Sequence, residues 1–121
     1  PQAAAADVAV RSGVVARQTG QRVIGVIENM SAMTLPDGTT LDLFGSGGGE
    51  AVARALSTDG DVPVLGSVPL STSLRAGGDA GAPVVITDPD DAAALALEAI
   101  AARIAARPRG LAGRNLPVSP A

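Results

Sequence analysis

Hydrophobic residues follow two different spacings along this chain, and these predict helices alternating with strands. Val8 and Val15 are seven residues apart and Val10 and Val14 are four apart, which is the spacing of one helical face. Near-continuous apolar runs, by contrast, are typical of strands covered on both faces of a sheet. The predicted elements are a helix over 3–19, a strand over 23–27, a small hairpin or tight loop over 33–44, a short helix over 50–56, a second strand over 62–68, one helical turn over 71–76, an extended piece over 83–86 and a last helix that ends at 107.

Turn and capping residues support two of these elements. The Asp37-Gly38 pair favours a tight turn between the two halves of the expected hairpin. At the last helix, Asp88 is the expected cap and Pro89 the expected first helical residue, because proline suits the position where no backbone donor is needed. The helix is therefore expected to begin close to residue 89.

The order of the elements predicts an α/β fold with a parallel sheet. The chain has 121 residues, which is the length of a single domain. We expect residues 1–107 to form one folded unit and residues 108–121, rich in Pro, Gly, Arg and Ser, to be a flexible tail. Because the sequence begins with Pro1 rather than Met, we expect further sequence upstream.

Composition narrows the possible functions. The net charge is −3, all nine basic residues are arginine, and no stripe of basic and aromatic residues is present, so we expect no nucleic-acid partner. No apolar run approaches membrane-spanning length, so we expect no membrane association and a cytoplasmic protein. The chain has no Cys and no His, which excludes thiolate metal sites, disulfides and histidine acid–base catalysis within it.

A glycine cluster from Gly45 to Gly49 follows the first apolar run and opens the short helix. It does not match the phosphate-loop pattern, because the chain has no lysine. It also does not match G-x-G-x-x-G, because Glu50 stands at the third glycine position. Two interpretations stay open: a tight turn where backbone segments pack closely, which the sequence favours, and direct contact with phosphate.

Three residues at the ends of the two predicted strands are candidates for base recognition. Asn29 ends the first apolar run, and its carboxamide offers the donor and acceptor that match the N7 and N6 edge of adenine. The alternative is an asparagine that only turns the chain. Pro69 and Leu70 follow the second run, where an apolar face or a carbonyl could hold a purine ring, or where the chain simply turns.

Taken together, these motifs resemble the carboxyl-terminal half of the Mrp/ApbC family. The matching stretches are Pro1-Gln2, Val23 to Ser31 (VIGVIENMS), Phe44 to Gly49 (FGSGGG) and Gly66 to Pro83 (GSVPLSTSLRAGGDAGAP). Proteins of this family are P-loop ATPases of the MinD/ParA-like class, associated with iron–sulfur cluster assembly and transfer. The resemblance covers Pro1 to about Arg107 and implies the carboxyl-terminal portion of a P-loop NTPase sheet with flanking helices.

The resemblance implies ATP binding with magnesium in a homodimer, slow hydrolysis, and apo iron–sulfur proteins as clients. It also implies that Asn29 lies against adenine and that Pro69 and Leu70 close over the base. The family's phosphate loop, magnesium ligands and switch aspartate belong upstream of Pro1. This chain should therefore show no ATPase activity by itself, and no catalytic residue is expected within it.

One departure from the family affects the expected cluster chemistry. Many members carry a Cys-Pro-x-Cys motif through which a cluster can bridge two subunits, and the corresponding segment here is Leu35-Pro36-Asp37-Gly38. Leu and Gly have no side-chain ligand atoms, so cluster binding by that route is excluded. The hypothesis is a fragment of an ATP-binding iron–sulfur carrier; the alternatives are a fragment of a MinD/ParA-type positioning ATPase and a non-enzymatic α/β adaptor.

Overall fold

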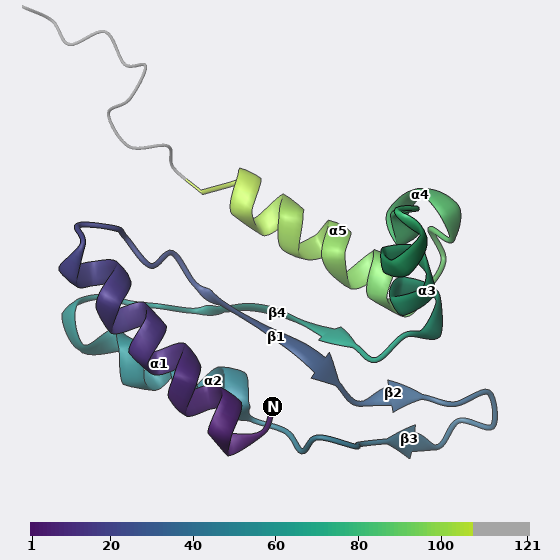
Figure 1. The fold of residues 1–121 in the computed structure, drawn as a ribbon, viewed down its shortest axis with the longest axis horizontal. Coiled ribbons are helices and arrows are strands. Elements are labelled where there is room, and N and C mark those ends of the chain that lie inside the picture. Colours follow the sequence, from purple (N-terminus) through teal and green to yellow (C-terminus); the bar gives the residue numbers. More distant parts are fainter. Residues whose placement is uncertain (108–121) are drawn as a thin grey trace, which may run out of the picture.

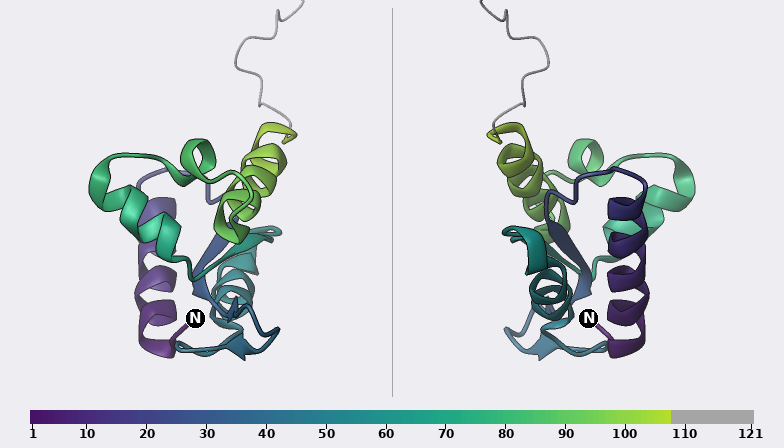
Figure 2. Two further views of the ribbon diagram at one scale, coloured as in Figure 1. Left: turned by 90° about the vertical axis from the view of Figure 1, so that its right-hand side faces the viewer. Right: turned by 90° about the vertical axis from the view of Figure 1, so that its left-hand side faces the viewer.

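The computed structural model describes residues 1–107, except for the side chain of Asp59. The expected α/β architecture is confirmed: helices pack on both sides of a parallel pair of strands (Figures 1 and 2). The predicted tail, residues 108–121, lies outside the described residues. The elements in order are α1 (Ala3–Gln18), β1 (Val26–Ser31), β2 (Met33–Thr34), β3 (Thr40–Leu41), α2 (Gly48–Leu56), η1 (Ser57–Asp59), β4 (Val64–Pro69), α3 (Thr72–Ala80), α4 (Val84–Thr87) and α5 (Ala92–Ala105).

The central feature is the parallel pairing of β1 with β4, which brings the carboxyl ends of both strands to the same edge. The register places Val26 opposite Val64 and Asn29 opposite Val68. β2 and β3 form a separate antiparallel hairpin that extends from the end of β1 (Figure 1). Within residues 1–107, no strand pairs with the other edge of β1.

Two apolar clusters form the core, one on each side of the strands. On one side α2 packs with α1 against β1, and its cluster contains Val52 and Leu56. On the other side α5 covers β4, and its cluster contains Leu65 and Ile100. Fully burying a Val, Leu or Ile side chain contributes roughly 1.5–3 kcal/mol, so these clusters hold the helices on the strands.

The hairpin, the first helix and the helix after the glycines form where the sequence predicted them, but both central strands begin later. β1 starts at Val26, because its pairing begins where the Val26 amide donates to the Pro63 carbonyl (2.9 Å). Val23, expected in the strand, instead packs on the apolar cluster of α2. Asn29 therefore lies inside the carboxyl end of β1 and not after it.

The segment between β4 and α5 also differs from expectation. α3 continues through Gly77 and Gly78 to Ala80, although the glycines were expected to end it. The piece over 83–86, expected to be extended, is the helical turn α4, because the Pro83 carbonyl accepts the amides of Ile86 (2.9 Å) and Thr87 (3.1 Å).

The cap of α5 is Asp91 and not Asp88. The Asp91 Oδ1 atom accepts the Ala93 amide at 2.8 Å, which satisfies a free donor in the first turn. Asp88 instead accepts a hydrogen bond from the Ser73 hydroxyl at 2.9 Å and so links this segment to α3. None of the helices within residues 1–107 has the length and apolar character needed to cross a membrane.

Two adjacent glycines of α3 provide a matched test of this packing. A Cβ at position 77 would lie 2.4 Å from the Ala82 carbonyl oxygen, whereas a Cβ at position 78 would meet nothing within 4 Å. We expect Gly77→Ala to lower the free energy of unfolding by about 1–3 kcal/mol, because backbone must move. Gly78→Ala should raise it by about 0.5–1 kcal/mol, because alanine favours the helix. Urea denaturation measures both, and equal effects of the two substitutions would contradict the packing described.

Candidate functional site

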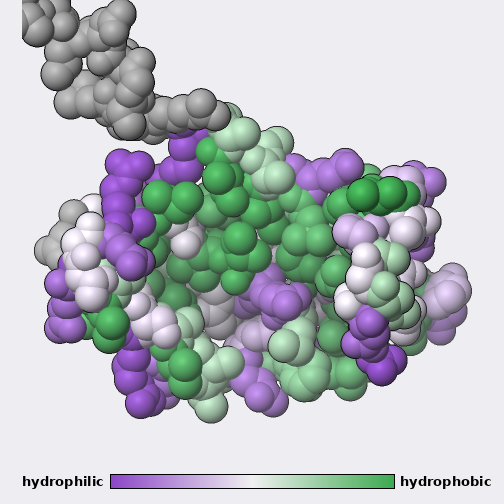
Figure 3. Space-filling view, turned by 45° about the horizontal axis from the view of Figure 1, so that its top comes forward, coloured by the Kyte–Doolittle hydropathy of each residue, from purple (hydrophilic) through white to green (hydrophobic). Residues whose placement is uncertain are grey.

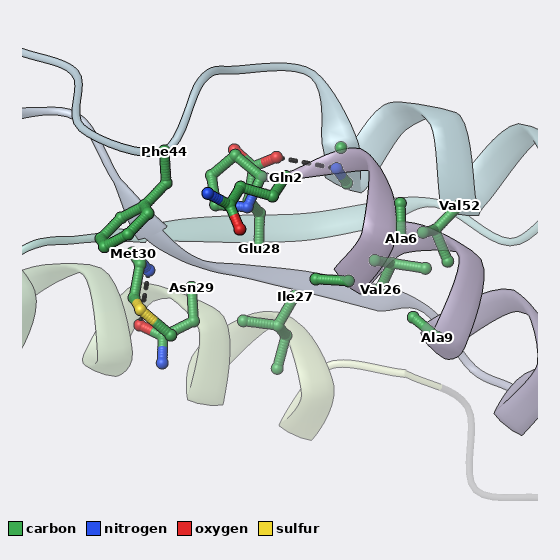
Figure 4. A pocket seen from close by; sticks show the side chains of 14 residues that line it. Gln2, Ala6, Ala9, Val26, Ile27, Glu28, Asn29, Met30, Phe44 and Val52 are labelled. Atoms are coloured by element: carbon green, nitrogen blue, oxygen red, sulfur yellow. Dashed lines mark hydrogen bonds between the residues drawn. The ribbon is translucent and has the colours of Figure 1, made fainter.

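The candidate site lies at the carboxyl end of β1, where the hairpin, the glycine turn and the start of α1 meet. A cavity of about 320 Å³ is found there, lined by the first turns of α1, by β1 from Val26 to Met30, by Phe44 and by the start of α2. Figure 4 shows its side chains: Glu28 points from β1 toward α2, whereas Ile27 and Asn29 point to the opposite side of the strand. The strand thus divides the site into two faces.

Glu28 joins β1 to the glycine turn. Its Oε2 atom accepts the Gly49 amide at 2.7 Å, and the residue is only 8% exposed. This amide belongs to the first turn of α2, where backbone donors are unpaired and the helix dipole favours negative charge. The carboxylate therefore occupies the position in which an anion would bind at this helix.

This contact bears on the two interpretations of the glycine cluster. Phosphate binding there would need free amides, and it would have to tolerate a carboxylate at the same helix end. Gly49 donates to Glu28, and a Cβ at position 49 would lie 3.0 Å from the Glu28 Cβ. The glycine there allows a close approach of turn and strand, so the geometry supports the tight-turn interpretation.

Asn29 is exposed at the carboxyl end of the parallel pair. Its Oδ1 atom accepts the Met30 amide at 2.8 Å, and its Nδ2 group makes no hydrogen bond to any residue from 1 to 107. The side chain therefore retains two donor hydrogens and one acceptor lone pair for a ligand. That Asn29 contacts a base stays a prediction.

Pro69 and Leu70 lie beside the end of β1, at the same sheet edge as Asn29. Pro69 is opposite Ser31 in the register, and the Leu70 amide donates to the Ser31 carbonyl at 3.0 Å. Both are half-buried, and neither lines the cavity that contains Asn29. The structure thus brings the three residues to one edge, and their contact with a base stays a prediction.

Two features of the site were not expected from the sequence. Met30 has a φ of 57°, the only left-handed residue other than glycine among residues 1–107. Glu28 was not singled out, although an acidic residue directly after an apolar run is a signal, because such a residue is rarely buried without a partner. Both flank Asn29, so the residue proposed to read the base is held between two constrained neighbours.

The hairpin at the position of the family's cysteine motif is closed by Asp37. Its carboxylate accepts the Thr39 hydroxyl at 2.5 Å and the Thr39 amide at 2.9 Å. These two bonds stabilise the ionised form and lower the pKa of Asp37 below its ordinary value, the hydroxyl contributing most. Among residues 1–107, no group of three or more His, Cys, Asp or Glu side chains is arranged to hold a metal ion.

Comparison with known proteins agrees with this geometry. Residues 1–105 match the ParA family of proteins described as NUBPL iron-transfer P-loop NTPases. The chain belongs to this family. A parallel sheet that presents its carboxyl edge between covering helices is the arrangement expected for a portion of such an NTPase.

Curated relatives in the ParA family carry matching names. The chain is 52% identical over 122 residues to the iron-sulfur cluster carrier protein of Mycobacterium tuberculosis, covering 99% of this chain and 32% of the relative. It is 48% identical over 93 residues to the protein of that name from Synechocystis, covering 75% of this chain and 25% of the relative. It is 39% identical over 108 residues to the mouse cytosolic Fe-S cluster assembly factor NUBP2, covering 88% of this chain and 38% of the relative. The chain thus spans about a third of the length of the M. tuberculosis relative.

The left-handed conformation of Met30 is open to a direct test. Met30 and Ile27 lie on the same strand and are 49% and 46% exposed. Met30→Gly should leave the free energy of unfolding within about 1 kcal/mol of the wild-type value. Glycine removes the penalty of the left-handed conformation, and this gain offsets the greater conformational entropy that glycine loses on folding. Ile27→Gly should cost at least about 2 kcal/mol, through lost burial and lost strand propensity. Urea denaturation compares them, and an equal loss would argue against the strained conformation.

The pKa of Asp37 predicts a pH dependence of the hairpin. Because folding lowers the pKa of Asp37, its stabilising contribution is present above the unfolded-chain pKa and is lost as pH falls through the folded pKa. A carbon-detected NMR titration should therefore give a midpoint below the ordinary aspartate value. Thr39→Val should raise this midpoint, because the hydroxyl is lost, whereas Thr40→Val should leave it unchanged. A midpoint that does not respond to Thr39→Val would contradict the bond.

Proposed function

We propose that this chain provides the base-recognition and dimer-facing part of an ATP-binding iron–sulfur cluster carrier. The observation that carries the proposal is the exposed carboxamide of Asn29 at the carboxyl edge of the β1–β4 pair, which is where ligands bind in open α/β sheets. Membership of the iron-transfer NTPase family supports the nucleotide and the cargo. The name of the mouse relative, a cytosolic Fe-S cluster assembly factor, supports a cytoplasmic location.

In this proposal, the chain's own residues recognise the adenine ring. The Asn29 carboxamide can donate to N7 of adenine and accept from its N6 amino group at the same time. Guanine has an acceptor, O6, in place of that amino group, so the carboxamide favours adenine over guanine. Pro69 and Leu70 would provide an apolar surface beside the ring. Their place next to Ser31, two residues from Asn29, is compatible with a base between the two strand ends.

The triphosphate would be held by residues outside this chain. The chain contains no lysine, and the amide of Gly49 is already bonded to a carboxylate. We therefore propose that the phosphate loop and the magnesium ligands belong to a longer protein and that the chain alone does not hydrolyse ATP. The span of 32% of the M. tuberculosis relative supports this division.

The open edge of β1 supports the same division. Parallel strands are usually covered and paired on both sides, yet within residues 1–107 β1 pairs only with β4. Ile27, near the start of β1, is 46% exposed, and Figure 3 shows hydrophobic side chains gathered over the middle of one face of the molecule. We propose that a further strand from the longer protein covers this edge.

The iron–sulfur cluster, as cargo, would need ligands from elsewhere. The hairpin segment Leu35-Pro36-Asp37-Gly38 has no cysteine, and the chain has none at all. We propose a homodimer that passes clusters to apo client proteins, with no step of that transfer made by side chains of this hairpin.

Nucleotide preference tests the proposal. In the whole protein, Asn29→Ala should weaken ATP binding about ten-fold and reduce the preference for ATP over GTP, because one bidentate base contact is worth about 1–3 kcal/mol. Gln21→Ala removes a similar exposed carboxamide before β1, at the other end of the strand, and should change neither affinity. Competition with a fluorescent ATP analogue measures both.

The outcomes separate the proposal from its rivals. An unchanged ATP-over-GTP preference in Asn29→Ala would remove Asn29 from the base site. A wild-type protein that binds neither nucleotide would favour a non-enzymatic adaptor instead.

A further inference from the structure

Glu28 is the only charged residue that is buried among the residues whose side chains are described. It lies in β1 between Ile27, which ends an apolar run, and Asn29. Burying a carboxylate is costly unless strong donors compensate it, and a well-packed apolar residue is often as stable at such a place. The presence of a carboxylate here therefore calls for an explanation beyond filling the core.

The compensating donor comes from a different element. Glu28 Oε2 accepts the Gly49 amide at 2.7 Å, a distance typical of a charge-assisted hydrogen bond. The N-cap residue of α2, Gly47, has no side chain and makes no capping bond, so the first turn of α2 is capped from the strand. The contact thus fixes β1 to the glycine turn at one point.

This attachment controls the direction of the next side chain. Side chains alternate across a strand, so a fixed Glu28 on the α2 side requires Asn29 to point to the opposite side. Figure 4 shows this arrangement, with Glu28 directed toward α2 and Asn29 away from it. The next residue, Met30, has a left-handed backbone conformation, so the strand is not regular after Asn29. The direction of the Asn29 side chain is therefore not fixed by regular strand geometry on that side.

We infer that Glu28 is a positioning residue for nucleotide recognition. Held by the Gly49 amide, it sets the rotation of β1 about its axis and so the direction in which the Asn29 carboxamide meets the base. It acts through Asn29 and touches no ligand itself. This inference rests on the proposed function, because it concerns the selectivity of the same base site.

Three substitutions at Glu28 and one control test the inference. Glu28→Gln keeps the length and an acceptor oxygen, Glu28→Asp keeps the charge but shortens the reach, and Glu28→Ala removes the contact. Ser57→Ala is the control: at the other end of α2, the Ser57 hydroxyl accepts the Val62 amide at 3.1 Å and donates to the Ala53 carbonyl at 2.8 Å. It removes a comparable link of α2 that lies away from Asn29.

Two measurements are made on each variant. Hydrogen exchange of the Gly49 amide, followed by NMR in the whole protein, reports the contact itself. The ratio of ATP to GTP affinity, from competition with methylanthraniloyl-ATP in the whole protein, reports the direction of Asn29. A role limited to stability would change the melting temperature but not this ratio.

We expect Glu28→Ala and Glu28→Asp to exchange the Gly49 amide at least about ten-fold faster and to reduce the ATP-to-GTP ratio about five- to ten-fold, the scale of one net hydrogen bond. Glu28→Gln should restore the ratio to within about two-fold of wild type, because it keeps an acceptor. Ser57→Ala should leave both the Gly49 exchange and the ratio unchanged.

The results separate this inference from the proposed function. If wild type prefers ATP and the Asp variant keeps that preference, the positioning role is wrong and the proposed function stands. The same conclusion follows if Ser57→Ala reduces the ratio as much as the Glu28 variants do. If Glu28→Ala does not fold, the ATP-to-GTP affinity ratios of Glu28→Asp and Glu28→Gln test the inference. If wild type binds neither nucleotide, the proposed function fails and the inference fails with it.

Discussion

The hydrogen bond from the Gly49 amide to the buried Glu28 carboxylate is the contact on which the geometry of the site depends. It joins the central strand to the helix that covers it, caps that helix, and leaves little room for a side chain at position 49, where strand and turn approach each other. Because one carboxylate meets all three demands, a change at Glu28 alters the strand direction and the turn together. The exposed Asn29 carboxamide next to it takes its orientation from this arrangement.

The two sides of β1 therefore have different roles: one is packed against α2, and the other is exposed. On the side of α2, Glu28 and the apolar cluster around Leu56 hold the strand in place. On the other side, and at the carboxyl edge, the chain presents an amide group and the turn after β4, with no lysine and no metal-ligand cluster among the described residues. This division suits the base-recognition role that we propose for this member of the iron-transfer NTPase family.

Local sequence patterns predicted the elements that depend on neighbouring residues. They did not predict the element boundaries that depend on contacts between distant parts of the chain. The Asp37-Gly38 hairpin and the helix after the glycines follow from turn chemistry and helical spacing. The start of β1 depends on its pairing with β4, and α3 continues past Gly77 because the chain returns closely at Ala82, which no local pattern records. Likewise Asn29 could be named as a candidate from its position after an apolar run, whereas the contact that singles out Glu28 is with Gly49, 21 residues further along the chain.

The central claim is that the carboxyl edge of β1 and β4 faces the adenine ring. Photolabelling of the whole protein with 8-azido-ATP tests it most directly, because the azide sits beside N7 and reacts with the nearest residues. The account predicts that the label maps to peptides containing residues 29–31 or 69–71 and that excess ATP prevents the labelling. Specific, ATP-protected label found only on other segments would contradict it.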